Sequence, residues 1–236
     1  MPSIEQMRAV LTGPPDAAAP WLELAAGRGS AEAQTALGQF LLTGHGVTQD
    51  AARAVHWFRR AARADYPMAF NMLGRCYELG LGVEASPLVA TYWYHLAAQA
   101  GLDWGMYNYA TSLMLGRGVD QDRAAAFGWF RKAAEQGHTK SINIVGGFHE
   151  DGWEVPADRD AAFRCYRQAA EGGDFRGQFN YARLLAGNGC IDEALHWLRE
   201  STRTATPRFI SQMRDFLRTC NDERLHAFAL SLPDTP

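Results

Sequence analysis

The sequence lacks the features that would place the protein in a membrane or on nucleic acid. Nowhere in its 236 residues does an apolar run approach the length of about 18–20 residues that a bilayer-spanning helix needs. An excess of basic residues is also missing, because 23 Lys and Arg stand against 26 Asp and Glu and leave a net charge of −3. Binding to a phosphate backbone needs clustered Lys and Arg. We therefore expect neither a membrane protein nor a nucleic-acid-binding protein.

Cysteine is scarce and is not arranged for metal binding. The four cysteines, Cys76, Cys165, Cys190 and Cys220, form no CxxC pair, and their spacings match no zinc-site pattern. We expect reduced thiols, with Cys76 and Cys165 as small apolar core residues. The N-terminal stretch MPSIEQMRAVLTG lacks the basic start and the apolar run of a secretory signal. The sequence thus predicts a cytoplasmic protein without a metal or a cofactor.

A period of 36 residues organises most of the chain. It shows first in the spacing of Trp21, Trp57, Trp93 and Trp129, each of which is followed by an Ala-Ala pair. Alignment on this period gives repeats at 31–66, 67–102, 103–138 and 139–174, and a shorter fifth repeat at 175–202. Self-similarity with a period of about 20–50 residues is typical of a solenoid.

Each repeat contains two helical patterns. The first, such as AEAQTALGQFLL, carries a small residue at one fixed position, which would let a neighbouring helix approach closely: Gly38, Gly74, Ala110, Gly146 and Ala182. The second, such as DAARAVHWFRRAAR, begins at an Asp that can cap a helix N-terminus, as at Asp50, Asp122 and Asp158. The Trp and its aromatic neighbour supply the apolar stripe, and we expect the Trp column, Trp129 included, to be core.

A glycine pair lies between the two patterns, as in Gly116-Arg117-Gly118-Val119. Its place before a helix raises the alternative of a phosphate-binding loop. Such a loop is needed once in a site and usually adds Lys-Ser/Thr on the following helix, whereas this pair recurs from repeat to repeat. We therefore interpret it as a turn whose glycines permit positive φ. Repeat four departs from it with Gly152-Trp153-Glu154.

The combined pattern AxAQxxLGxxLxxGxGVxxDxxxAxxWFxxAAxxG resembles the Sel1-like repeat, a relative of the tetratricopeptide repeat. The resemblance implies an all-α, right-handed α/α solenoid of about five helix-turn-helix repeats with helical caps. Residues 1–30 would form an N-terminal cap, with a helix at 3–12 closed by Gly13-Pro14 and then a lone second helix. Residues 31–202 would form the repeats, the fifth with a short turn. Residues 203–236 would add two amphipathic capping helices.

Histidine-based chemistry has one candidate, His149, which takes a column position that is otherwise mostly apolar. In FHEDGWE a zinc-binding HExxH would need a second histidine where Trp153 stands. We interpret His149 as a partly buried histidine, with an acidic binding surface and a metal or catalytic site as the alternatives. No G-x-S-x-G nucleophile pattern is present.

The resemblance further implies that the first helix of each repeat lines a concave groove. Aromatic, Met and Arg side chains in a groove are what protein interfaces concentrate. Trp104 and Tyr107 stand one helical turn apart, and they either face a partner or pack against the adjacent helix. The candidate partner-binding residues are Met68, Asn71, Arg75, Trp104, Tyr107, Met114, Lys140, Asn143, Glu150, Arg176, Phe179 and Arg183.

Proteins of this type are typically adaptors, so the resemblance implies a non-catalytic scaffold that binds a protein or a peptide. An immunity-type protein that neutralises a cognate toxin is the first alternative. The second is an enzyme, because some cysteine-rich relatives have been linked to β-lactam hydrolysis. Those relatives carry a disulfide in each repeat, and here the cysteines are out of register and no S-x-x-K pair occurs.

Overall fold

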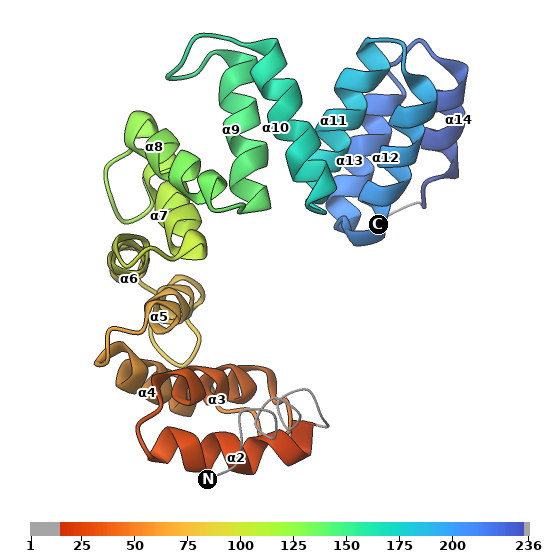
Figure 1. The fold of residues 1–236 in the computed structure, drawn as a ribbon. Coiled ribbons are helices and arrows are strands. Elements are labelled where there is room, and N and C mark those ends of the chain that lie inside the picture. The colour runs from red at the N-terminus through yellow and green to blue at the C-terminus, as the bar shows by residue number, and fades with distance from the viewer. Residues whose placement is uncertain (1–14, 234–236) are drawn as a thin grey trace. The chain divides into compact units, whose positions relative to one another are not determined.

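The computed structural model describes residues 15–233, and this part of the chain consists of thirteen α-helices with no strand (Figure 1). This confirms the all-α repeat architecture, while the helix expected at residues 3–12 and its Gly13-Pro14 end lie outside the described residues. The helices are α2 (Pro15–Gly27), α3 (Ala31–Thr43), α4 (Ala51–Ala62), α5 (Pro67–Leu79), α6 (Pro87–Gln99), α7 (Asp103–Leu115), α8 (Arg123–Glu135), α9 (Thr139–Asp151), α10 (Arg159–Glu171), α11 (Phe175–Gly187), α12 (Ile191–Thr204), α13 (Pro207–Leu217) and α14 (Glu223–Ser231).

Each repeat consists of two helices. We name the first helix of a repeat its A helix (α3, α5, α7, α9, α11) and the second its B helix (α4, α6, α8, α10, α12). A helices of successive repeats contact each other, as α5 does with α7 and α9 with α11. The chain divides into two compact units, Met1–Trp129 and Phe130–Pro236, called here the N-terminal and C-terminal units. Each is described by itself.

Aspartates begin three of the five B helices, at the positions that the sequence predicts. The carboxylate oxygen of Asp50 accepts the backbone N–H of Arg53 at 2.9 Å, and that of Asp158 accepts the N–H of Ala161 at 2.9 Å. Asp122 does the same for Ala125 at 2.8 Å. The first N–H groups of a helix have no partner inside the helix, so these carboxylates fix where α4, α8 and α10 begin. Ser86 caps α6 instead, and α12 has no side-chain cap.

The glycine pairs are turns. Gly44, Gly80 and Gly116 end their A helices with φ of 71°, 68° and 66°, in the left-handed region. The second glycine also makes a close contact, because a Cβ on Gly118 would lie 2.2 Å from the carbonyl oxygen of Pro87. The loop therefore packs on the first turn of the preceding B helix and has a structural role. In repeat four, Glu154 takes the second glycine's place with φ of 59°.

The prediction that the Trp column forms the core holds in part, because Trp57 and Trp93 pack against the core but are only partly buried. The residue after each Trp is the fully buried one: Phe58 is 0% exposed, whereas Trp57 is half-buried and Trp21 is 45% exposed. The small residue of the A helix explains this choice. A Cβ on Gly38 would lie 2.4 Å from the ring of Phe58, and one on Gly146 would lie 2.8 Å from that of Tyr166. Each ring fills the space that the missing side chain leaves.

The end of the chain departs from the repeat pattern as expected. Residues 188–190 alone join α11 to α12, whereas residues 44–50 join α3 to α4. Helices α13 and α14 are the two predicted amphipathic caps. Their buried side chains, among them Met213, Leu217 and Leu225, extend the core of the C-terminal unit.

The cysteines of the described residues form no disulfide. Cys76 is fully buried, and burial raises the pKa of its thiol to about 11, so that it stays protonated at neutral pH. Cys165 is only half-buried, so it meets the core prediction in part. Across residues 15–233, none of the helices has the length and apolar character to cross a membrane.

Candidate binding surface

A pair of asparagines joins neighbouring A helices in each unit. In the N-terminal unit the Nδ2 group of Asn108, on α7, donates to Oδ1 of Asn71, on α5, at 2.8 Å. In the C-terminal unit Nδ2 of Asn180, on α11, donates to Oδ1 of Asn143, on α9, at 2.9 Å. In both pairs the two residues are 37 positions apart. We call these two contacts the amide pairs.

The amide pairs change the interpretation of two predicted binding residues. Asn71 is 4% exposed and Asn143 is 8% exposed, so most of each side chain is buried rather than displayed to a partner. Each amide pair uses one N–H and one C=O. Within the described residues, Nδ2 of Asn71 and Oδ1 of Asn108 make no further hydrogen bond, and neither is a fully buried atom. Every pair thus keeps one donor and one acceptor at the edge of the A-helix surface.

Aromatic side chains stand beside the amide pair of the N-terminal unit. Trp104 is 40% exposed and Tyr107 is half-buried, and their rings meet edge to face with centroids 6.1 Å apart. Trp104 precedes Asn108 by four residues, which places the two on one face of α7. The start of α7 is held against α6 at Gly105, where a Cβ would lie 2.5 Å from that of Ala97. The Trp104 ring is therefore presented from a fixed helix.

The remaining predicted residues of the N-terminal unit differ in exposure. Arg75, on α5, is exposed, whereas Met68 on α5 and Met114 on α7 are half-buried. The two methionines, together with Trp104 and Tyr107, give this surface aromatic and thioether groups, which suit packing against varied apolar side chains.

In the C-terminal unit one predicted binding residue is covered by the chain itself. Phe179, on α11, packs edge to face between Phe209 and Phe216 of α13, with ring centroids 5.5 and 5.4 Å away. The capping helix has no repeat signature, so the sequence did not place it over α11. The structure assigns Phe179 to the contact with the cap and leaves it only half-buried.

Glu150 is also committed to contacts within the unit. Its Oε2 accepts hydrogen bonds from Arg183, at 2.5 Å, and from the hydroxyl of Tyr166, at 2.8 Å. Burial raises the pKa of this carboxyl, but the bonds from Arg183 and Tyr166 outweigh that effect and hold the pKa below its usual range. Glu150 and Arg183 therefore join repeats four and five. Glu78 accepts from Tyr94 at 2.7 Å in the same way.

Two basic residues complete the A-helix surface of the C-terminal unit. Lys140, on α9, is half-buried, and Arg176, on α11, is exposed. The guanidinium carbon of Arg176 lies 4.5 Å from the ring centroid of Phe175 and 5.6 Å from that of Phe209. Two rings thus hold this cation in place.

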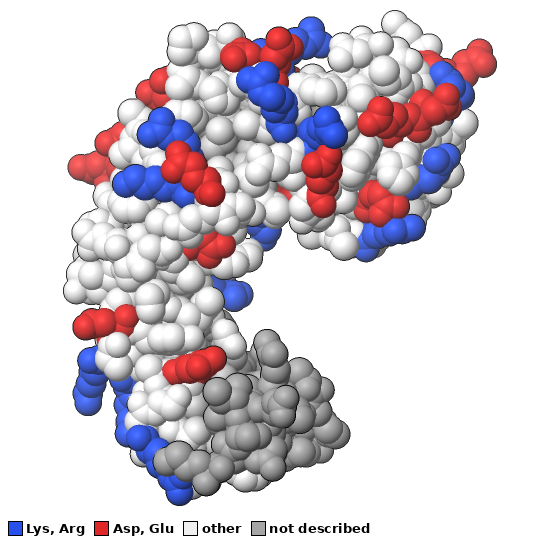
Figure 2. Space-filling view, in the orientation of Figure 1, with Lys and Arg blue, Asp and Glu red and all other residues white. Residues whose placement is uncertain are grey.

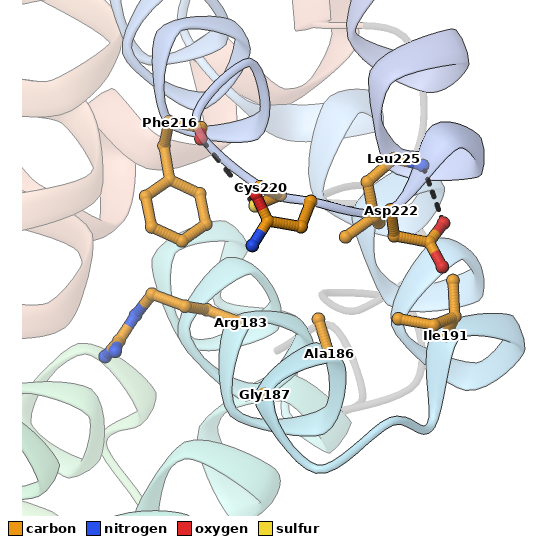
Figure 3. Close-up of a pocket in the computed structure, with 9 residues that line it drawn as sticks. Arg183, Ala186, Gly187, Ile191, Phe216, Cys220, Asp222 and Leu225 are labelled. Carbon is orange, nitrogen blue, oxygen red and sulfur yellow. Dashed lines mark hydrogen bonds between the residues drawn. The ribbon is translucent and has the colours of Figure 1, made fainter.

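A cavity of about 430 Å³ lies next to this surface, at the end of the C-terminal unit (Figure 3). Ala186, Ile191, Phe216 and Leu225 give it apolar walls, and Cys220 and Asp222 lie on the α13–α14 link. Arg183 contributes only its stem, because its guanidinium points away from the cavity. Burial raises the pKa of the Cys220 thiol, so this sulfur is a poor nucleophile.

The surface outside the A helices offers one uncharged B helix. Helix α6 contains no Lys, Arg, Asp or Glu, and Figure 2 shows no charged side chains over it on the face in view. Its Leu88 and Tyr92 are well exposed. His149 is half-buried on α9, and the described residues contain no group of three or more His, Cys, Asp or Glu side chains that could hold a metal ion.

Asn108 and Asn180 were missing from the sequence-based candidates. The candidates follow the strict period of 36 residues, whereas each amide pair joins residues 37 apart. The signal that could have found them is the recurrence of that offset, from Asn71 to Asn108 and again from Asn143 to Asn180. In each pair the second asparagine lies one position further along its A helix than the repeat period would place it.

Comparison with known proteins gives a consistent family match. The Sel1 repeat model matches residues 31–66, 67–102, 105–138 and 140–174 of this chain. Among the curated proteins none matches its sequence.

Several solved structures have the same fold. A Sel1 repeat protein from Oxalobacter formigenes is 29% identical with a TM-score of 0.74, over 84% of this chain and 59% of that one. A protective antigen with an SLR fold from uropathogenic Escherichia coli is 27% identical with a TM-score of 0.70, over 89% of this chain and 45% of that one. This chain thus spans less than two thirds of either protein. An immunity protein from Pseudomonas aeruginosa, 18% identical with a TM-score of 0.54 over 85% of this chain and 80% of that one, shares the fold alone.

Proposed function

The chain belongs to the Sel1 repeat family, and we propose that it is a non-catalytic scaffold that binds a protein or peptide segment on the surface of its A helices. Stacked helix pairs form an extended binding surface on one side of the array. The fold by itself fixes no function, so the proposal depends on what the side chains of this surface offer.

The amide pairs carry the proposal. Asn71 keeps a free N–H donor and Asn108 keeps a free C=O acceptor at the edge of their pair. An extended peptide presents the complementary groups, because each residue has one main-chain N–H and one C=O. Main-chain hydrogen bonds of this kind provide affinity, and pockets for side chains provide specificity. Asn143 and Asn180 offer the same arrangement in the C-terminal unit.

The side chains around the pair of the N-terminal unit support the same function. Trp104 and Tyr107 offer a large ring surface at a small cost in conformational entropy, and buried aromatic anchors dominate binding energies at interfaces. A bound segment that pairs with Asn71 and Asn108 would place a neighbouring apolar side chain on Trp104.

The direct test is selection of peptides from a displayed random library on the full chain, followed by affinity measurement with the purified peptide. Asn71→Leu/Asn108→Leu replaces both amides by apolar groups of similar shape, a change that leaves stability nearly unaffected when no unpaired partner remains. We expect this variant to bind the selected peptide at least tenfold more weakly while its helicity stays the same.

Asn143→Leu/Asn180→Leu is the matched control, since it removes the other amide pair. A selected peptide that binds at one amide pair should lose affinity in the variant of that pair and keep its affinity in the other variant. Affinities unchanged in both variants, or a library that yields no peptide at all, would overturn the proposal.

The immunity-type alternative shares the binding chemistry and differs in the partner, a toxin instead of an endogenous client. The immunity protein with this fold is 18% identical, so its likeness bears on the fold alone. The β-lactam-hydrolysing alternative makes a separate prediction. Sustained turnover of nitrocefin by the purified chain would contradict the scaffold proposal.

A further inference from the structure

We infer that the A-helix surface of the C-terminal unit selects a peptide segment with an acidic side chain, and that Arg176 pairs with that carboxylate. The inference rests on the proposed function, because it assigns the partner chemistry of the same surface. It concerns side-chain selection, whereas the amide pairs concern the main chain.

Arg176 is a cation held in place without an acidic partner. Its guanidinium lies over the rings of Phe175 and Phe209. Arg167 and Arg183 in the same unit each pair with a glutamate, but Arg176 forms no ion pair with any described residue. Stacking restricts its rotamers before binding, which lowers the entropy that binding would cost. The planar guanidinium keeps N–H donors that match both oxygens of a carboxylate.

The position of Arg176 relates it to the amide pair. Arg176 precedes Asn180 by four residues on α11, so both lie on one face, with Cβ atoms about 5–6 Å apart. In an extended peptide, side chains on the same side recur about every 6–7 Å. A peptide residue near the one paired with Asn143 and Asn180 can therefore place its carboxylate on Arg176.

The equivalent positions in the two units show that the side-chain chemistry differs while the amide pair is kept. Where α7 has Trp104, α11 has Arg176, and where α5 has Met68, α9 has Lys140. The acidic residue on this surface, Glu150, is bound to Arg183 and Tyr166. Glu150 therefore does not compensate the positive charge of Arg176, and a basic group at a binding surface favours an acidic partner.

The experiment is peptide selection from a displayed random library on the wild-type chain and on Arg176→Glu, with sequencing of both pools. The wild-type pool should be enriched at least threefold in Asp and Glu over the input library. Arg176→Glu should lose this enrichment and bind an acidic wild-type peptide at least tenfold more weakly. Raising the salt concentration should weaken wild-type binding, because it screens the charge pair.

Two further variants keep the result interpretable. Arg176→Met keeps an apolar stem on the rings and removes only the charge, so it should weaken acidic peptides as well. Arg164→Glu makes the same charge change at an exposed position on α10 and should stay within twofold of wild type. Selected peptides without acidic enrichment, or acidic peptides that Arg176→Glu and Arg176→Met bind as tightly as wild type does, overturn this inference and leave the scaffold proposal standing. A library that yields no peptide overturns both.

Discussion

The ring of Tyr94 lies so close to Gly74 that a Cβ on this glycine would be 2.5 Å from two ring carbons. The ring has little freedom to move, because its hydroxyl donates to Glu78 at 2.7 Å and the side chain is almost completely buried. This contact joins the A helix of repeat two to its own B helix. It explains why a helix tolerates glycine at this position despite a propensity cost of about 1 kcal/mol.

Gly74→Ala should therefore destabilise the protein even though alanine is the better helix former. We expect a loss of about 1–3 kcal/mol in the free energy of unfolding, typical of an overpacked core, measured by urea denaturation. Gly128→Ala on α8 is the control, because a Cβ there would meet no atom within 4 Å. It should gain roughly 0.5–1 kcal/mol from propensity. Equal effects of the two changes would contradict the packing account.

Phe58 and Trp57 are neighbours with different roles in the core. Phe58→Ala removes a fully buried ring that fills the space over Gly38 and should cost about 3–5 kcal/mol. Trp57 is half-buried, with the guanidinium carbon of Arg60 4.9 Å from its ring centroid, so Trp57→Ala should cost clearly less. Thermal and urea melts measure the loss of stability in both variants. A larger loss for Trp57→Ala than for Phe58→Ala would show that the Trp column, and not the residue after it, forms the core.

These two residues show where sequence reasoning ends. The period of 36 residues, the aspartate caps and the glycine turns could be predicted from the sequence, because each depends on residues that are close together in the chain. Period alone does not decide which of two adjacent aromatics points inward. That choice depends on the empty space at Gly38, which belongs to a different helix.

The binding surface could also be predicted only in part. Trp104 and Arg176 could be placed on A helices from their position in the repeat. The contact of Phe179 with α13 could not, since the cap carries no repeat pattern. The amide pairs were missed because they join residues 37 apart instead of 36, and the contact between neighbouring A helices that selects this offset depends on packing.

The Glu150–Arg183 pair should make stability depend on pH in a defined direction. The folded-state pKa of Glu150 is depressed, so its contribution is fully present above the unfolded value of about 4.3 and is lost as the pH falls through the lower folded value. At pH 7, Glu150→Gln should lower the free energy of unfolding by about 1.5–3 kcal/mol, the range for hydrogen bonds to a charged group. The difference from wild type should shrink as the pH falls below about 4.

Glu171→Gln provides the comparison for that pair. Glu171 binds Arg167 at 2.8 Å, but both side chains are more than half exposed, and exposed pairs contribute about 0–1 kcal/mol. Its variant should follow the wild-type pH profile closely. If the difference in free energy of unfolding between wild type and Glu150→Gln stays constant from pH 7 to pH 3, the proposed role of Glu150 is contradicted.

Trp104 and Tyr107 give the prediction that separates a binding patch from a structural one. Trp104→Ala/Tyr107→Ala removes two neighbouring rings from the A-helix surface of the N-terminal unit, and Trp104 is 40% exposed. We expect the affinity for a selected peptide that reads the Asn71–Asn108 pair to fall at least tenfold, because aromatic anchors carry much of an interface's energy. The helical circular dichroism signal should stay unchanged.

Leu88→Ala/Tyr92→Ala is the control. It removes two well-exposed apolar side chains from the B helix α6 and should leave the affinity within twofold of wild type. Loss of helicity in the first variant would make Trp104 and Tyr107 structural residues, and equal losses of affinity in both variants would remove the A-helix surface as the binding site.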